Sequence, residues 1–203
     1  MSKGIDITLV QDYYRRLSDQ EFIKIVTKEL SGLTLEAIDV VKSEISRRNL
    51  NPNIANGVDA QHRDYTIEDI DSYCNLLQNL PNAKGDSVSE RLNAVRVVEV
   101  ASFILFTNRR ESIVVGNSES MNAAVNLALL KCTLFGWWGI PWGPIQTIQG
   151  IRLNLKNKNL IGSVKPTKAL REFVMQNIGE IVTYKNDPAK LKEIIGYPAK
   201  NGL

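Results

Sequence analysis

Residues 132–151 read Cys-Thr-Leu-Phe-Gly-Trp-Trp-Gly-Ile-Pro-Trp-Gly-Pro-Ile-Gln-Thr-Ile-Gln-Gly-Ile. The segment holds all three tryptophans of the chain, four of its thirteen glycines and no charged residue. Because proline in a helix interior costs about 3 kcal/mol and glycine about 1 kcal/mol, one straight helix through Gly136–Pro144 is disfavoured. We therefore expect Met121–Leu155 to fold back on itself at this bend, with three indoles at its tip: Trp137, Trp138 and Trp142.

The charges around the bend have one sign. No Asp or Glu lies between Glu119 and Glu172. The net charge is −4 for residues 1–80 and +7 for residues 81–203, which indicates an anionic partner for the second part. The acid-free interval carries only cations: Lys131, Arg152, Lys156, Lys158, Lys165, Lys168 and Arg171.

Length and composition indicate a folded protein. A chain of 203 residues with 43% hydrophobic and 23% charged residues fits one or two globular domains. The start, Met1-Ser2-Lys3-Gly4, lacks the apolar core of a secretory signal, so we expect a cytoplasmic protein. Cys74 and Cys132 fall on apolar helix faces, which favours two buried free thiols over a disulfide.

The first eighty residues have helical patterns with clear start signals. Ser18 and Glu21 have the spacing of a capping box. Thr34 and Thr66 are expected N-caps of two further helices, the first with Glu36 in its first turn. We predict a helical region over residues 1–80.

The middle of the chain predicts a β-hairpin. Residues 95–107 are rich in Val, Ile and Phe, with an expected bend at Ala101-Ser102, and the polar stretch 108–111 separates them from residues 112–115. A lone hairpin is marginally stable in water, so we expect its apolar side chains to be buried. Exposure of most of them would instead indicate an interface. The five side chains are Val98, Val100, Phe103, Ile104 and Phe106.

The helical pattern returns after the hairpin, from Ser118 or Ser120 to the bend, and again from Thr167 and from Pro188. The predicted fold class is α+β, mostly helical, with a central β-hairpin and a bent apolar helical hairpin. We expect residues 1–80 to form the helical N-terminal region. Residues 81–203 would form the hairpin, the bent helical hairpin and the C-terminal helices.

Residues 136–144, Gly-Trp-Trp-Gly-Ile-Pro-Trp-Gly-Pro, resemble a block in uncharacterised bacterial proteins, where it joins two apolar helices. The resemblance implies a zinc-ribbon-like hairpin just upstream, spanning with the block about residues 80–155. None of the positions that match its Cys-x-x-Cys pairs is a cysteine here, so a four-ligand zinc site is not expected. Those positions are Pro81 with Lys84 before Gly85, and Asn117 with Ser120 after Gly116.

The sequence gives little support to catalysis. His62 is the only histidine and lies in a polar segment without an evident partner. Glu68, Asp69 and Asp71 fit the first turn of a helix, where negative charge is favoured. No hydrolase motif or phosphate-binding loop is present, so we assign no catalytic residue, metal or cofactor.

The Trp/Gly/Pro block leaves two interpretations open, a rigid core corner and a membrane contact. The leading hypothesis is a non-catalytic module that docks on an anionic membrane surface or a membrane protein. It would be cytoplasmic, peripheral or shallowly inserted at the inner membrane face. The alternative is a soluble scaffold whose metal-free hairpin binds protein or, less favoured, nucleic acid. The sequence does not define the oligomeric state. The contact residues proposed for docking are Trp137, Trp138, Trp142, Lys131, Arg152, Lys156 and Lys158.

Overall fold

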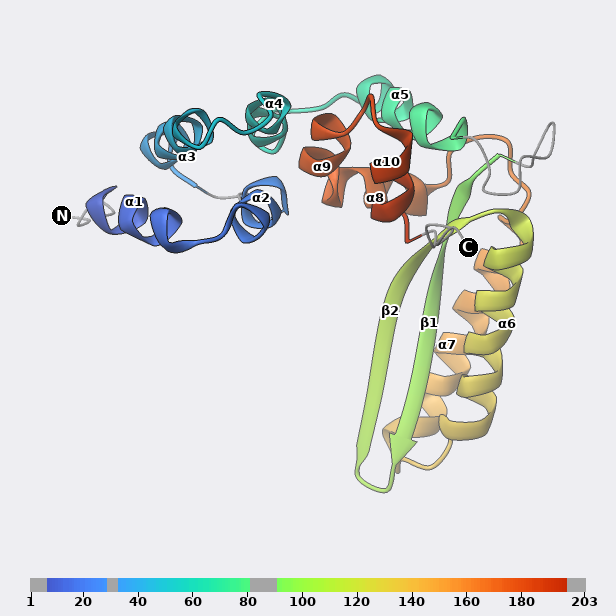
Figure 1. The fold of residues 1–203 in the computed structure, drawn as a ribbon. Helices are drawn as coiled ribbons and strands as arrows, with labels where there is room; N and C mark the ends of the chain where they lie inside the picture. Colours follow the sequence, from blue (N-terminus) through green and yellow to red (C-terminus); the bar gives the residue numbers. More distant parts are fainter. Residues whose placement is uncertain (1–6, 29–32, 81–90, 197–203) are drawn as a thin grey trace, which may run out of the picture.

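The computed structural model describes residues 7–28, 33–80 and 91–196. An arched helical part carries a long projection made of one β-hairpin and two helices (Figure 1). The arch contains α1 (Ile7–Arg16), α2 (Asp19–Lys28), α3 (Leu35–Arg47), α4 (Asn53–Ala60), α5 (Ile67–Gln78), α8 (Lys168–Gln176), α9 (Ile178–Thr183) and α10 (Pro188–Ile194). The projection, which we call the finger, contains β1 (Asn93–Phe103), β2 (Phe106–Gly116), α6 (Ser118–Phe135) and α7 (Trp142–Lys158). The predicted fold class, α+β and mostly helical, is confirmed.

The helix starts in the arch follow the local sequence. The predicted capping box forms at α2, where the Ser18 hydroxyl donates to the Glu21 carboxylate at 2.6 Å and accepts from the Glu21 backbone N–H. A second capping box joins Thr66 and Asp69 at α5. Thr34 is the N-cap of α3 as predicted, although its side chain makes no capping hydrogen bond.

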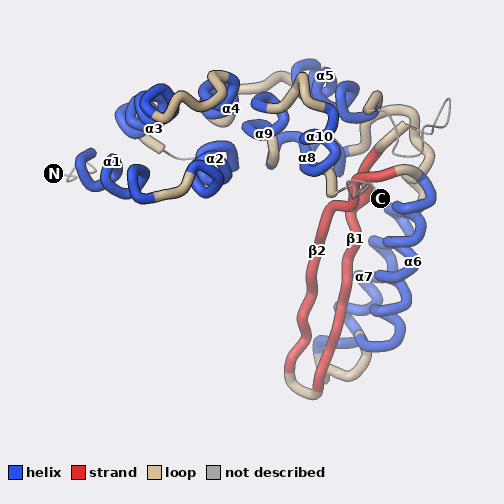
Figure 2. The backbone as a smooth tube through the Cα atoms, in the orientation of Figure 1, coloured by secondary structure: helices blue, strands red, loops and turns tan. Residues whose placement is uncertain are grey.

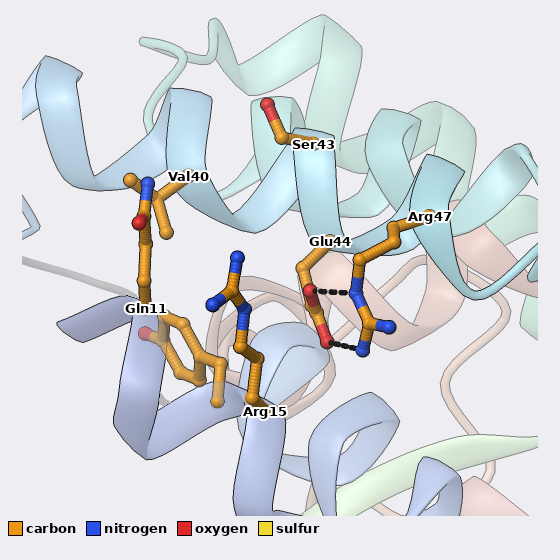
Figure 3. A pocket seen from close by; sticks show the side chains of 7 residues that line it. Gln11, Arg15, Val40, Ser43, Glu44 and Arg47 are labelled. Carbon is orange, nitrogen blue, oxygen red and sulfur yellow. Dashed lines mark hydrogen bonds and ion pairs between the residues drawn. The ribbon is translucent and has the colours of Figure 1, made fainter. Parts of the chain in front are cut away.

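One buried ion cluster ties α1 to α3. The Arg48 guanidinium donates to the backbone carbonyls of Tyr14 and Leu17 at 2.6 and 2.9 Å, and to the Glu44 carboxylate at 2.6 Å. Arg47 pairs with the same carboxylate beside a cavity of about 80 Å³ that Gln11, Arg15, Val40 and Ser43 also line (Figure 3). Hydrogen bonds from the two arginines lower the pKa of Glu44 to about 2. The buried pair of Arg48 and Glu44 therefore joins α3 to the end of α1, and we assign it a structural role.

The C-terminal helices return to the N-terminal part of the chain. Leu170 and Val174 of α8 are fully buried in one core with Cys74 and Leu77 of α5. The Arg171 guanidinium pairs with the Asp71 carboxylate, 2.6 Å from Nε to Oδ1. The chain thus leaves the arch at residue 80, builds the finger, and comes back to complete the arch (Figure 2).

The hairpin is longer and more regular than the sequence suggested. Its antiparallel register runs from Asn93 opposite Gly116 to Phe103 opposite Phe106, so the turn consists of Ile104 and Leu105. The expected bend at Ala101-Ser102 is wrong, since both residues lie within β1. The expected break at residues 108–111 is also wrong, because these residues pair within β2. β2 is an edge strand of the sheet. Charged residues such as Arg109 and Arg110 are common in edge strands and do not prevent the backbone of β2 from pairing with β1.

The second edge of β1 is covered by side chains of the helices. Asn154, which is fully buried, accepts from the Val98 backbone N–H at 2.8 Å and donates to the Val98 carbonyl at 2.7 Å. Asn157 donates to the Arg96 carbonyl at 2.8 Å, and Cys132 lies 3.3 Å from the Val98 carbonyl. These helix side chains therefore satisfy backbone groups of Arg96 and Val98 that the pairing with β2 leaves open.

The predicted fold-back is confirmed. α6 ends at Phe135 and α7 begins at Trp142, and the two helices run side by side along β1 (Figure 1). Both cysteines are buried free thiols, as predicted.

Candidate docking site at the finger tip

Two loops meet at the far end of the finger (Figure 1). One is the hairpin turn, and the other is the bend between α6 and α7. The Ile140 backbone N–H donates to the Ile104 carbonyl at 3.2 Å, which joins the two loops directly. We call residues 103–106 and 134–145 together the tip.

A buried serine and three glycines hold the two loops in contact. The Ser102 hydroxyl, 7% exposed, donates to the Gly136 carbonyl at 2.7 Å. A Cβ atom on Gly139 would lie 2.6 Å from the Thr107 hydroxyl oxygen, and one on Gly143 would lie 2.9 Å from the Gly136 carbonyl oxygen. Only glycine allows this close approach, so the tip is a preorganised unit.

The hairpin turn places an isoleucine in a backbone conformation that β-branched residues rarely adopt. Ile104 has φ of +45°, a conformation that glycine and asparagine adopt more readily than a β-branched residue. An isoleucine there costs about 1–2 kcal/mol and is also 65% exposed to solvent. Stability and solubility would both favour another residue, which suggests that the apolar turn serves an interaction.

The tip exposes a large apolar surface. Val98 and Val100 are buried as predicted, but the predicted burial of Phe103, Ile104 and Phe106 is wrong, because these side chains are 75%, 65% and 78% exposed. The exposed large apolar side chains of the tip are Phe103, Ile104, Leu105, Phe106, Leu134, Phe135, Trp137, Trp138, Ile140, Trp142 and Ile145. These side chains are exposed rather than packed in a core corner, and an apolar patch of this extent makes the tip a candidate for an interaction surface.

The indoles are exposed rather than buried in a core. Trp137, Trp138 and Trp142 are 42%, 68% and 63% exposed. The Trp138 indole N–H donates to the Leu134 carbonyl at 3.0 Å, so its polar group is satisfied within the protein. Its ring can therefore enter an apolar environment without losing a hydrogen bond to water.

The four predicted cationic contacts lie at different heights above the tip. Lys131 is one turn above the end of α6 and pairs with Glu99 of β1, 2.6 Å from Nζ to Oε1. Arg152 and Lys156 are exposed on α7, whereas Lys158 donates to the Asn126 side chain at 2.8 Å. At 1.5 Å per residue, Lys156 and Lys158 lie about 21–24 Å along α7 from Trp142, too far to share one plane with the indoles.

Two further cations near the tip, contributed by β2, were not predicted from the sequence. Arg109 lies about 10 Å along the strand from Phe106, and Arg110 follows it on the exposed edge. Arg109 pairs with Glu111 at 2.7 Å, and the hydrogen bonds from Arg109 and Arg96 lower the pKa of Glu111. One feature of the sequence could have indicated them. Residues 103–106, Phe-Ile-Leu-Phe, lie midway between two strands of equal length, and a turn there places Arg109 and Arg110 just above it. We call Arg109, Arg110, Lys131 and Arg152 the collar.

Other candidate sites gain no support. His62 is exposed beside the Val58 carbonyl, and Asp69 caps α5. Across the described ranges, no group of three or more His, Cys, Asp and Glu side chains is arranged to hold a metal ion. Of the ribbon positions implied by the resemblance, Asn117 caps α6 by accepting from the Ser120 N–H at 2.9 Å. Pro81, Lys84 and Gly85 lie outside the described residues.

The comparisons with known proteins found no matching family model, curated protein or solved structure. The resemblance of residues 136–144 therefore stays an expectation. Among the helices that the structure describes, none combines the length and apolar character needed to cross a bilayer.

Proposed function

We propose that the protein is a non-catalytic module that docks on an anionic membrane surface through the tip and collar of its finger. The observation that carries the proposal is the exposed tip: eleven large apolar side chains, each 42–79% exposed, on a preorganised end. Between Glu99 and Arg109, and again between Lys131 and Arg152, the sequence has no charge. This part of the finger can leave water without burying an ion.

The collar has the height expected of groups that meet lipid phosphates. Lys131 lies about 6 Å along α6 from Phe135, Arg109 about 10 Å along β2 from Phe106, and Arg152 about 15 Å along α7 from Trp142. Amphipathic elements bury their apolar surface about 5–10 Å deep in the boundary between headgroups and acyl chains. Insertion to that depth brings Lys131 and Arg109 to the level of the anionic headgroups, and the long side chain of Arg152 extends toward them from above.

The energetics favour reversible docking. Even at about 1 kcal/mol for each partly exposed side chain, insertion of the tip releases about 10 kcal/mol. Ordering and dehydration of polar groups oppose this, so the net affinity falls well below that figure. The expected behaviour is peripheral, salt-sensitive binding rather than permanent anchoring.

The experiment is flotation of the full chain with vesicles of phosphatidylcholine alone or mixed with phosphatidylglycerol. We expect binding to the anionic vesicles, weaker binding to the neutral ones, and a loss of affinity between low salt and about 0.5 M salt. Absence of binding to anionic vesicles at low salt would refute the membrane proposal. Binding to a membrane protein or to a soluble partner would then be tested in its place.

A further inference from the structure

Above the tip, apolar surface continues along one side of the finger only. On α6, Leu127, Leu130 and Leu134 recur three and four residues apart and are 51%, 54% and 52% exposed. The solvent side of α7 adds Ile145, Ile148 and Leu155, which are 46%, 42% and 50% exposed. We call these six side chains the helical face; Leu134 and Ile145, where it joins the tip, belong to both surfaces. Leu127 lies about 12 Å along α6 from Phe135, so the face extends well beyond the tip.

The opposite side of the finger is polar at the same height. β2 forms this side, since α6 and α7 lie along the other edge of β1 (Figure 1). Directly after Phe106, β2 carries the exposed polar residues Asn108, Arg110 and Glu111. An end-on insertion deep enough to bury Leu127 and Leu130 would carry the charged residues of β2 into the acyl chains as well, which the cost of burying charge opposes.

The charges on the helical face favour anionic lipid over a second copy of the chain. Arg152 is exposed on α7 between Ile148 and Leu155, four and three residues away, and Lys156 follows one turn later. Glu119, in the first turn of α6, is the only acidic residue of the two helices. It lies eight residues before Leu127, so the stretch of a second copy that matches the helical face would bring no carboxylate. Lipid phosphates provide the missing anions, and the long stems of Arg and Lys allow their charges to reach them.

We infer that the finger docks obliquely, with the helical face turned into the acyl chains of an anionic leaflet and the polar part of β2 no deeper than the headgroups, where Arg109 and Arg110 still reach phosphates. In this pose Leu127, Leu130 and Leu134 contact acyl chains together with the tip. Arg152 and Lys156 reach headgroup phosphates, although Lys156 lies about 21 Å along α7 from Trp142 and end-on insertion would leave it far from them. The inference rests on the proposed function and adds to it a second contact surface and an orientation.

The test compares two fluorescent labels at matched heights. Leu130→Cys on α6 lies about 7.5 Å from the end of its helix, and Asn108→Cys on β2 lies about 7 Å from Phe106. The native thiols need no replacement, because Cys74 and Cys132 are buried and burial raises the pKa of both, that of Cys74 to about 12. Each labelled chain is bound to phosphatidylglycerol vesicles whose acyl chains carry bromine, a quencher confined to the bilayer interior.

The oblique pose predicts several-fold stronger quenching of the label at residue 130 than of the label at residue 108. Equal quenching of the two labels on vesicle-bound protein would overturn the orientation while leaving the proposed function standing. Absence of vesicle binding by the unlabelled chain would refute the proposed function and the orientation with it. A lipid-free dimer that protects residue 130 from an aqueous quencher would assign the helical face to a second copy instead.

Charge variants give an independent measurement. Arg152→Gln and Lys156→Gln should each weaken binding to anionic vesicles about fivefold, the fold-change equivalent to about 1 kcal/mol per cation near the surface. The matched control is Lys185→Gln, which removes an exposed cation from the loop after α9 and should leave binding unchanged. If Lys156→Gln binds as tightly as the original chain, α7 does not lie along the membrane.

Discussion

Replacing the two phenylalanines beside the hairpin turn tests how much of the docking energy the turn supplies. Phe103 and Phe106 face each other in the last pair of the hairpin and are 75% and 78% exposed. Full burial of a phenylalanine is worth about 2.5 kcal/mol, so insertion of these rings should yield about 1.5–2 kcal/mol each. The double variant Phe103→Ser/Phe106→Ser should lose about 3 kcal/mol of binding, which corresponds to about a hundredfold weaker partition.

The assay is co-sedimentation with anionic vesicles over a range of lipid concentrations. Because neither ring is packed in the core, the free energy of unfolding should change by no more than about 0.5 kcal/mol for each substitution. The matched control is Leu35→Ser/Ile67→Ser, which removes two side chains that are 79% and 67% exposed on α3 and α5, far from the tip. Equal losses in both double variants, or no loss at the tip, would refute the reasoning.

Three further substitutions test the account. Asn154→Leu should destabilise the fold by about 1–3 kcal/mol in chemical denaturation, because it leaves the buried N–H of Val98 unpaired and its carbonyl with only the weak donor Cys132; an unchanged midpoint would contradict this. Ile104→Asn should raise stability by about 1 kcal/mol by suiting the positive φ, and should weaken vesicle binding; a stability loss would show that φ imposes no strain. The pKa of Glu44, about 2 in the folded state, lies below its ordinary value of 4.5. The ionised Glu44 carboxylate therefore stabilises the folded state fully above about pH 4.5, and this contribution is lost as the pH falls toward 2. Glu44→Gln should therefore reduce stability at neutral pH by about 2–3 kcal/mol and flatten that acid loss, and an unaltered pH profile would exclude Glu44 as its source.

Local signals predicted the helices and the fold-back. Ser18 with Glu21 and Thr66 with Asp69 form their capping boxes from neighbouring residues alone. Proline and glycine likewise determine the break in the helix after Phe135. Proline lacks the N–H that a helix needs, and glycine has a low helix propensity, whatever the surrounding structure. Capping residues and helix-breaking residues both act within one or two helical turns, so the helix starts and the fold-back could be predicted from the neighbouring sequence.

Features that depend on distant pairing were missed. The hairpin turn has isoleucine and leucine where turn-forming residues are expected, and the polar stretch 108–111 offered a more conventional break. The true register becomes visible only when β1 and β2 are matched along their full lengths. The packing of α8 on α5 through Arg171 and Asp71 joins residues one hundred positions apart, and no local pattern specifies such a pair.

The candidate site was predicted in part. Trp137, Trp138 and Trp142 lie at the tip as expected, but the hairpin turn beside them was assigned to the core because exposed apolar strands are rare. That expectation fails at Phe103 and Phe106, because these apolar side chains lie at the exposed end of the hairpin. A mismatch of this kind between a residue and its environment is common at functional sites.

Intrinsic tryptophan fluorescence tests the central claim most directly, because all three tryptophans of the chain lie at the tip. On addition of phosphatidylglycerol vesicles, we predict a shift of the emission to the blue and a reduced quenching by aqueous acrylamide, both reversed by high salt. An unchanged spectrum from protein that sediments with the vesicles would contradict the account, since docking would then use a surface other than the tip.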